Sequence, residues 1–160
     1  MRDSAGPPCL VVVVDTEEEF DWSAPFDRGA TSVRHMRRIG RFQSVCEAWG
    51  VRPTYVVDYP IADQSDGVEA LAPLFRDGRA LIGAHLHPWV SPPHEEEVSA
   101  RNSYPGNLPR ALERAKLAAL RDRIEAAFGT RPRIYKAGRY GIGPNTFALL
   151  QELGFDVDLS

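Results

Sequence analysis

The sequence predicts an α/β fold in which five parallel strands alternate with helices, as in a partial (β/α) barrel that is incomplete at its C-terminus. Continuous apolar runs recur along the chain, as at 9–14 and 80–84, and are typical of strands buried on both faces. Between them lie segments with the apolar spacing of helices, and no internal repeat is visible. The chain has 160 residues, whereas a complete barrel of this type needs about 250.

The first half of the chain contains three expected strands, at 9–14, 54–57 and 80–84. Thr31 or Ser32 can cap a first helix, which Gly50 ends. The apolar stripe expected for this helix consists of Val33, Met36, Ile39, Val45 and Trp49. A shorter helix is expected at 68–75, and it stops at the Asp77-Gly78 pair.

The second half begins with a long proline-containing loop at 88–106, and loops of this length are often functional. Asn107 can cap the next helix, which Gly129 ends. The buried side expected for that helix consists of Leu112, Leu117, Leu120, Ile124 and Phe128. A strand at 133–137, a helix at 144–153 that begins with proline and a strand at 155–159 complete the series. The last strand has no partner after it, so we expect an open edge through which chains could associate.

Composition limits the class of protein. With 43% hydrophobic and 26% charged residues and a formal net charge of −3, the chain is typical of a globular domain and has no basic tract that would bind nucleic acid. Residues 1–8 contain neither a signal peptide nor a membrane span, so we expect a disordered N-terminal segment followed by one domain at 9–160. The two cysteines form no disulfide framework, and free thiols indicate a cytoplasmic location.

Two histidines, His85 and His87, lie one residue apart at the end of the third apolar run. Residues i and i+2 of a strand point to the same face, so both imidazoles would converge at a C-terminal strand end, where α/β folds build their sites. This geometry suits a divalent metal ion. The alternative is one buried histidine bonded to a backbone carbonyl and one in solvent.

Acidic residues follow the first apolar run. In Asp15-Thr16-Glu17 the two carboxylates share one side if the strand continues, so that one could bind a metal and the other act as a general base. Because Glu17, Glu18 and Glu19 form a charge run, a solvated loop is the alternative.

Other polar features carry less information. His94 lies in a polar loop and His35 in a basic segment, and both are expected in solvent. The glycine-containing turn at 138–143 could aim backbone N–H groups at an anion, although it has neither the Walker nor the dinucleotide-binding spacing.

Taken in order, three segments resemble the motifs of the polysaccharide deacetylases, the NodB homology domain of carbohydrate esterase family 4 (CE4). They are Val14-Asp15-Thr16-Glu17-Glu18-Glu19-Phe20-Asp21-Trp22, Ile82-Gly83-Ala84-His85-Leu86-His87-Pro88-Trp89 and Tyr135-Lys136-Ala137-Gly138-Arg139-Tyr140-Gly141. The likeness is greatest to the WalW-like branch, to which the segment Asn102-Ser103-Tyr104-Pro105-Gly106-Asn107-Leu108-Pro109 is also similar.

The resemblance implies a metal-dependent hydrolase that removes N-acetyl or similar acyl groups from a carbohydrate. Asp15 would be the general base, and Glu17, His85 and His87 would hold the metal, with Zn²⁺ expected first and Co²⁺ or Ni²⁺ as alternatives. The family usually places its two histidines four residues apart, which corresponds to Trp89 here, and His87 is the natural substitute. Lys136 stands where the family has an arginine that orients the base, and the backbone N–H near Tyr140 would help to form the oxyanion hole.

Two later family motifs, one of which supplies a histidine as general acid, have no counterpart before Ser160. The chain is therefore expected to be the N-terminal portion of such a domain, with impaired activity. The alternative from another class is a non-catalytic or vestigial carbohydrate-binding fragment. An amidohydrolase-like enzyme is a further alternative, but its histidine pair would be expected on the first strand rather than the third.

Overall fold

The computed structural model describes residues 9–160, which form one parallel five-stranded sheet in the order β1-β2-β3-β4-β5. The expected disordered segment at 1–8 lies outside the described residues. The strands are β1 (Val13–Thr16), β2 (Thr54–Val57), β3 (Leu81–Leu86), β4 (Ile134–Ala137) and β5 (Val157–Asp158). The five parallel strands and their alternation with helices confirm the predicted fold class.

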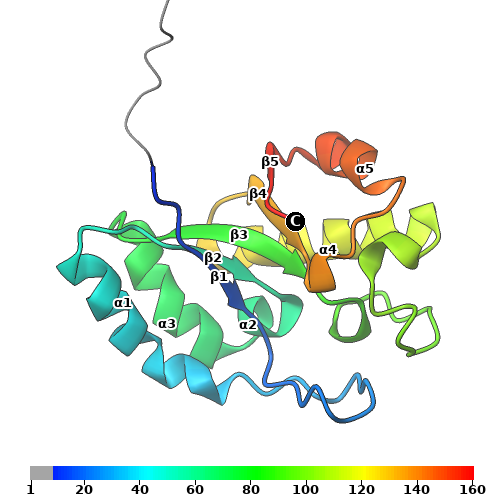
Figure 1. Cartoon of the computed structure of the whole chain (residues 1–160), viewed down its shortest axis with the longest axis horizontal. Helices are drawn as coiled ribbons and strands as arrows, with labels where there is room; N and C mark the ends of the chain where they lie inside the picture. Colours follow the sequence, from blue (N-terminus) through cyan, green and yellow to red (C-terminus); the bar gives the residue numbers. More distant parts are fainter. Residues whose placement is uncertain (1–8) are drawn as a thin grey trace, which may run out of the picture.

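Five α-helices connect the strands: α1 (Ile39–Ala48), α2 (Tyr59–Asp63), α3 (Ser65–Arg76), α4 (Arg110–Phe128) and α5 (Thr146–Leu153). Short 3₁₀ helices lie at η1 (Arg34–Arg38), η2 (Pro88–Val90), η3 (Pro105–Asn107) and η4 (Gly138–Tyr140). In Figure 1, α1 and α3 lie next to each other on one side of the sheet, and α5 lies near β5 at the other end. The core lies between the helices and the sheet, and all four residues of β2 are buried.

The strand boundaries shift toward the C-terminus relative to the prediction. β1 was expected at 9–14, but it begins at Val13, which pairs with Thr54, and continues through Asp15. Leu10 and Val11 lie before this pairing and are exposed. β3 likewise runs on to Leu86, so that His85 lies on the strand. An apolar run in the sequence indicates that a strand is present but does not fix its first and last residues. Those depend on where the neighbouring strand supplies hydrogen bonds.

The first helix differs from its prediction in its start and in its apolar stripe. The segment begins as η1 rather than as an α-helix capped by Thr31 or Ser32, because the Ser32 hydroxyl donates to the Glu19 carboxylate instead. Val45 and Trp49 were expected in the buried stripe but are exposed, Trp49 by 82%. The helix packs on the sheet through a narrower face than the sequence pattern indicates.

The third expected helix corresponds to α4, which begins later than predicted. Asn107 does not cap it, because Asn107 lies in η3 and donates to the Arg101 carbonyl, 2.8 Å away. Gly129 ends α4 as predicted, with a backbone φ of 72° that residues other than glycine rarely adopt. The short helix α2, which the sequence did not reveal, begins directly after β2.

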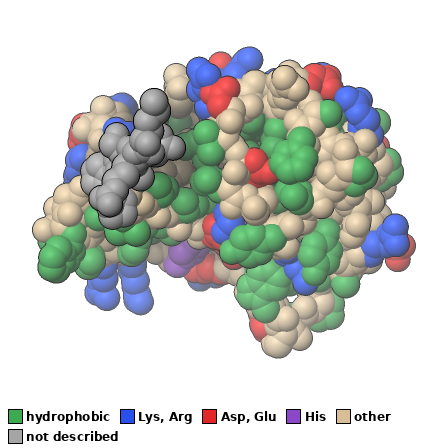
Figure 2. Space-filling view, turned by 45° about the horizontal axis from the view of Figure 1, so that its top comes forward, with side chains coloured by type: hydrophobic (Ala, Val, Ile, Leu, Met, Phe, Trp, Pro, Cys, Tyr) green, Lys and Arg blue, Asp and Glu red, His purple; other side chains and the backbone are tan. Residues whose placement is uncertain are grey.

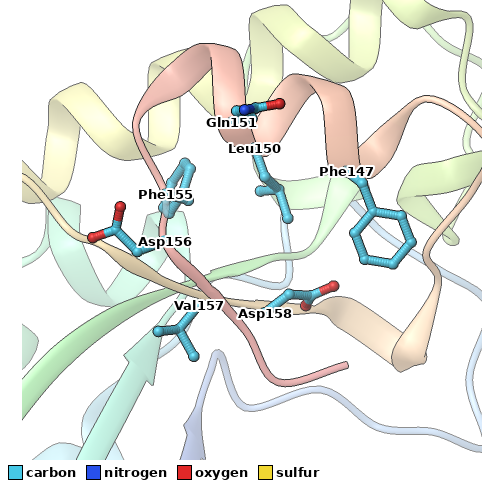
Figure 3. A pocket seen from close by; sticks show the side chains of 7 residues that line it. All are labelled: Phe147, Leu150, Gln151, Phe155, Asp156, Val157 and Asp158. Carbon is cyan, nitrogen blue, oxygen red and sulfur yellow. The ribbon is translucent and has the colours of Figure 1, made fainter.

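Among the described residues, β1 and β5 each pair with a neighbour on one side only. β5 is limited to Val157–Asp158, shorter than the predicted 155–159. A hollow of about 380 Å³ lies between α5 and this segment, and Leu150 and Phe147 are among the residues that line it. Figure 3 shows Leu150 pointing from the helix toward the strand. The edge that the sequence predicts is therefore present, and chain association through it stays a prediction.

The surface and the cysteines complete the description. Figure 2 shows that hydrophobic side chains gather in places on the drawn face. The exposed large ones include Leu10, Val45, Trp49, Phe147 and Val157. Cys9 and Cys46 are both free thiols. Within 9–160, every helix is too short or too polar to cross a membrane.

Candidate metal centre

The two histidines of the sequence motif come together at the C-terminal end of β3. His85 is on the strand, and His87 follows it as the residue that precedes η2. Both side chains are buried, and their ring centroids lie 4.8 Å apart. The strand thus continues its alternation far enough to bring both imidazoles to one place.

Glu17 completes a group of three potential ligands. It lies just after β1, and its Oε2 is 3.2 Å from His85 Nε2 and 3.3 Å from His87 Nε2. The ligand atoms of these three residues all lie within 4.8 Å of one another. The structure therefore brings together the three residues that the sequence proposed as metal ligands.

The opposite nitrogen of each imidazole is already hydrogen bonded. His85 Nδ1 lies 2.9 Å from the Lys136 carbonyl oxygen, which can only accept, so Nδ1 carries the proton and Nε2 has a free lone pair. His87 Nδ1 lies 2.8 Å from Glu18 Oε2, and donation to this carboxylate again leaves Nε2 free. Such outward hydrogen bonds fix the tautomer and the ring orientation of metal-bound histidines.

The ligand set fits a tetrahedral divalent ion. Two imidazole lone pairs and a carboxylate oxygen are three acceptors facing one point, an arrangement that a cation would stabilise. Metal–ligand bonds of about 2.0–2.2 Å in a tetrahedron separate the ligand atoms by roughly 3.3–3.5 Å. The separations of 3.2 and 3.3 Å between Glu17 and the histidines are close to that value, and the two histidine nitrogens lie within 4.8 Å of each other.

Electrostatics inside the group follow from burial and from the neighbouring charges. Burial raises the pKa of the Glu17 carboxyl, but the neighbouring His85, His87 and Lys136 side chains outweigh it, so the net pKa lies below its usual value. Burial lowers the pKa of His87. An ionised glutamate and neutral imidazoles are the forms in which these residues bind metals.

Asp15 and Lys136 form an ion pair beside this group. Lys136 Nζ lies 2.7 Å from Asp15 Oδ1 and 2.6 Å from Oδ2, and thus contacts both carboxylate oxygens. Burial lowers the pKa of Lys136, but the hydrogen bond and charge of Asp15 outweigh this effect and raise it. Lys136 pairs with His85 in the β3–β4 register, which places this ion pair next to the candidate ligands.

The turn after β4 is shaped by close contacts and by unusual backbone angles. A Cβ on Gly138 would lie 2.3 Å from the Leu86 carbonyl oxygen and 2.5 Å from His87 Cδ2, so only glycine fits there. Arg139 and Tyr140 have φ values of 54° and 55°, which cost energy for residues with a Cβ. The Tyr140 ring is exposed and covers Lys136 Nζ at 4.5 Å. Gly138, Arg139 and Tyr140 therefore border the candidate site.

Aromatic side chains pack beside His87. Trp89 stacks on the His87 ring with centroids 4.3 Å apart. Phe20 and Phe26 pack against Trp89, and Trp22 lies at their exposed edge. The Arg139 guanidinium lies 5.6 Å from the Trp22 ring centroid. Trp89 therefore supports the ligand His87 by packing.

Sequence reasoning missed two residues of the site. The run of three glutamates suggested a solvated loop, and Glu19 is indeed exposed, but Glu18 is only 3% exposed and bonds to His87. Asp58 directly follows β2 and is fully buried. Its position after a strand, like that of Asp15, was a signal that could have identified it.

The two remaining histidines lie away from the ligands. His35 is 3.5 Å from Glu19 on an exposed segment, as expected. His94 lies in the loop after β3 and is exposed. Its partial shielding from solvent and the charges of Lys116 and Arg28 lower its pKa. Neither belongs to the groups that could hold a metal among residues 9–160.

No protein-family model matches the sequence, and no curated protein matches it. Solved structures do resemble the fold. One is the chitin deacetylase from the fungal pathogen Colletotrichum lindemuthianum, with a TM-score of 0.59, 15% identity and coverage of 92% of this chain and 54% of that chain. Another is IcaB from Ammonifex degensii, with a TM-score of 0.58, 17% identity and coverage of 92% and 57%.

A CE4 family pseudoenzyme from Bacillus anthracis is similar as well, with a TM-score of 0.57, 14% identity and coverage of 77% of this chain and 38% of that chain. At these identities the likeness shows that the chain has the fold of CE4 deacetylases. The chain spans between 38% and 57% of the length of these three structures.

Proposed function

We propose that this chain belongs to a metal-dependent deacetylase that removes N-acetyl or similar acyl groups from a carbohydrate. The observation that supports it most is the convergence of His85 Nε2, His87 Nε2 and the Glu17 carboxylate beside the Asp15–Lys136 pair. The fold shared with CE4 deacetylases adds support. In this proposal residues 9–160 correspond to the N-terminal part of a NodB-like domain of the WalW-like branch, located in the cytoplasm.

Glu17, His85 and His87 would hold the ion, with Zn²⁺ expected first and Co²⁺ or Ni²⁺ as alternatives. When bound, the ion would act as a Lewis acid toward the acyl carbonyl and lower the pKa of a water molecule. The Asp15 carboxylate would accept a proton from the attacking water, because it lies beside the ligands and is 36% exposed.

Lys136 would orient Asp15 through its contacts with both carboxylate oxygens. Unlike the arginine of the family pattern, its ammonium is a single point charge without a planar fork. The backbone N–H of Tyr140 would donate to the oxyanion that forms on the carbonyl, and the exposed Trp22 ring would offer a face for the sugar.

The test is release of acetate from an N-acetylated oligosaccharide, with and without a chelator. Activity that a chelator abolishes and Zn²⁺ restores would support the proposal. Activity that persists in a chelated, demonstrably metal-free protein would contradict it.

A non-catalytic carbohydrate-binding role is the second candidate. The likeness to the CE4 pseudoenzyme from Bacillus anthracis favours it. Oligosaccharide binding without acetate release, in a protein loaded with metal, would identify this function.

A further inference from the structure

Glu18 connects the candidate ligand His87 to the protein interior. Its Oε2 lies 2.8 Å from His87 Nδ1, within hydrogen-bond distance, and its side chain has no exposed surface. The flanking glutamates differ from it, because Glu17 faces the imidazoles and Glu19 faces the exposed η1 segment. Among three identical residues in a row, only the middle one is directed to the back of a histidine.

Asp58 holds this glutamate in place through the backbone. Asp58 Oδ2 accepts from the Glu18 backbone N–H at 2.8 Å, and Oδ1 accepts from the Ile61 N–H at 2.9 Å, where Asp58 caps α2. Asp58 is fully buried at the end of β2, between β1 and β3 in the sheet. Its carboxylate therefore ties the segment after β1 to the start of a helix.

The arrangement is energetically costly, since two carboxylates are buried next to each other. The ligand atoms of Glu18, Asp58 and His87 all lie within 4.8 Å, and burial raises the pKa of both carboxyl groups. A second metal ion in this group would have to replace the hydrogen bond between His87 Nδ1 and Glu18, in a place with almost no exposed surface. The contacts are better explained as support for His87.

We infer that Glu18 and Asp58 are positioning residues for His87: Glu18 fixes the ring with its proton on Nδ1 and its Nε2 directed at Glu17, and Asp58 fixes Glu18. Glu18 acts on the ligand directly, and Asp58 acts through Glu18. The inference rests on the proposed function only in treating His87 as a metal ligand. The tautomer and orientation of the ring can be measured without metal.

The experiment compares four variants: Glu18→Gln, Glu18→Leu, Asp58→Asn and, as a control, Glu113→Gln. Glu113 is a buried carboxylate on α4 that accepts from Thr146 and not from any candidate ligand, so it controls for the loss of a buried charge. Thermal unfolding establishes that each variant is folded. Zn²⁺ affinity is measured by competition with a chromophoric chelator, and the His87 tautomer by ¹⁵N NMR of the metal-free protein.

We expect Glu18→Leu to weaken Zn²⁺ binding by about 10–100-fold, Glu18→Gln and Asp58→Asn to weaken it less, and Glu113→Gln to leave it unchanged. The His87 proton should lie on Nδ1 in the unchanged protein and distribute between both nitrogens in Glu18→Leu. Should Glu18→Leu not fold, Glu18→Gln provides the same two measurements.

Folded Glu18 variants with unchanged Zn²⁺ affinity and an unchanged His87 tautomer would overturn the inference. Two Zn²⁺ ions per chain, reduced to one in the Glu18 variants, would also overturn it, because Glu18 would then be a ligand. A protein that binds no Zn²⁺ but shows the tautomer change would support the positioning role and contradict the proposed function instead.

Discussion

Two groups of buried charges lie in this molecule, and they differ in what their polar atoms contact. At the ends of β1 and β3, Glu17, His85 and His87 direct three acceptor atoms at one another. On α4, the Lys116 ammonium donates to the carbonyls of Pro88 and Ser91 at 2.9 and 2.6 Å and pairs with Glu96 at 3.0 Å. Every donor of Lys116 is thereby used to hold the loop after β3.

The comparison shows that buried charge alone does not identify a site. Both groups hold buried side chains with shifted pKa values: burial lowers the pKa of His87 in the strand-end group and, despite Glu96, that of Lys116 in the α4 group. In the α4 group opposite charges satisfy one another. In the strand-end group acceptors of the same kind converge, and only an added cation or proton would satisfy them.

Removing a ligand should have the largest effect and would test the first half of the comparison. We expect His85→Ala to abolish stoichiometric Zn²⁺ binding and His87→Ala to do the same, because two ligands rarely suffice for a specific site. Metal content after purification and dialysis measures this, with His94→Ala as the control that keeps its metal. If only His87→Ala retained full occupancy, the third ligand would lie elsewhere.

Replacing the base should separate chemistry from metal binding within the strand-end group. Asp15→Asn keeps the shape of the side chain but cannot accept the proton, so we expect acetate release to fall by about 10²–10⁴-fold. Bound Zn²⁺ should stay at the level of the unchanged protein. Asp122→Asn, at an exposed position of α4, is the matched control. Near-normal activity of Asp15→Asn would assign the base to another carboxylate.

The fold class and the convergence of His85 and His87 could be predicted from the sequence because they follow from local patterns. The apolar runs mark the strands, and the one-residue spacing between His85 and His87 brings both rings to one face. What could not be predicted depends on contacts between distant segments. The burial of Glu18 requires Asp58, forty positions along the chain, and the exposure of Trp49 depends on what packs against α1.

Breaking the α4 group should cost stability rather than metal binding. Lys116→Met leaves the buried Glu96 with only Arg28, 3.8 Å away, as a counter-charge, and two carbonyls without a donor. We therefore expect a loss of about 3–5 kcal/mol in the free energy of unfolding. Chemical denaturation measures this loss. The double variant Lys116→Met with Glu96→Leu removes both charges and should recover part of it. A loss of Zn²⁺ affinity in a folded Lys116→Met protein would contradict the separation of the two groups.

The smallest expected effect concerns Glu113 and pH. Burial raises the pKa of this carboxyl in the folded protein above its value in the unfolded chain. The stability that this shift contributes is therefore fully present below the unfolded pKa and is lost as the pH rises through the folded pKa. In the folded protein Glu113 Oε1 accepts from the Thr146 hydroxyl, whereas Oε2 has no partner. Glu113→Gln keeps an acceptor for the Thr146 hydroxyl and removes the charge.

The variant should thus match the unchanged protein near pH 4 and be more stable at pH 7, as measured by urea unfolding across that range. Equal stability of both proteins at every pH would show that Glu113 is ionised in the fold at little cost. Zn²⁺ affinity should not change at any pH where both proteins are folded. The α4 group would then contribute to folding alone, whereas the strand-end group keeps its converging acceptors at an energetic cost that metal binding would offset.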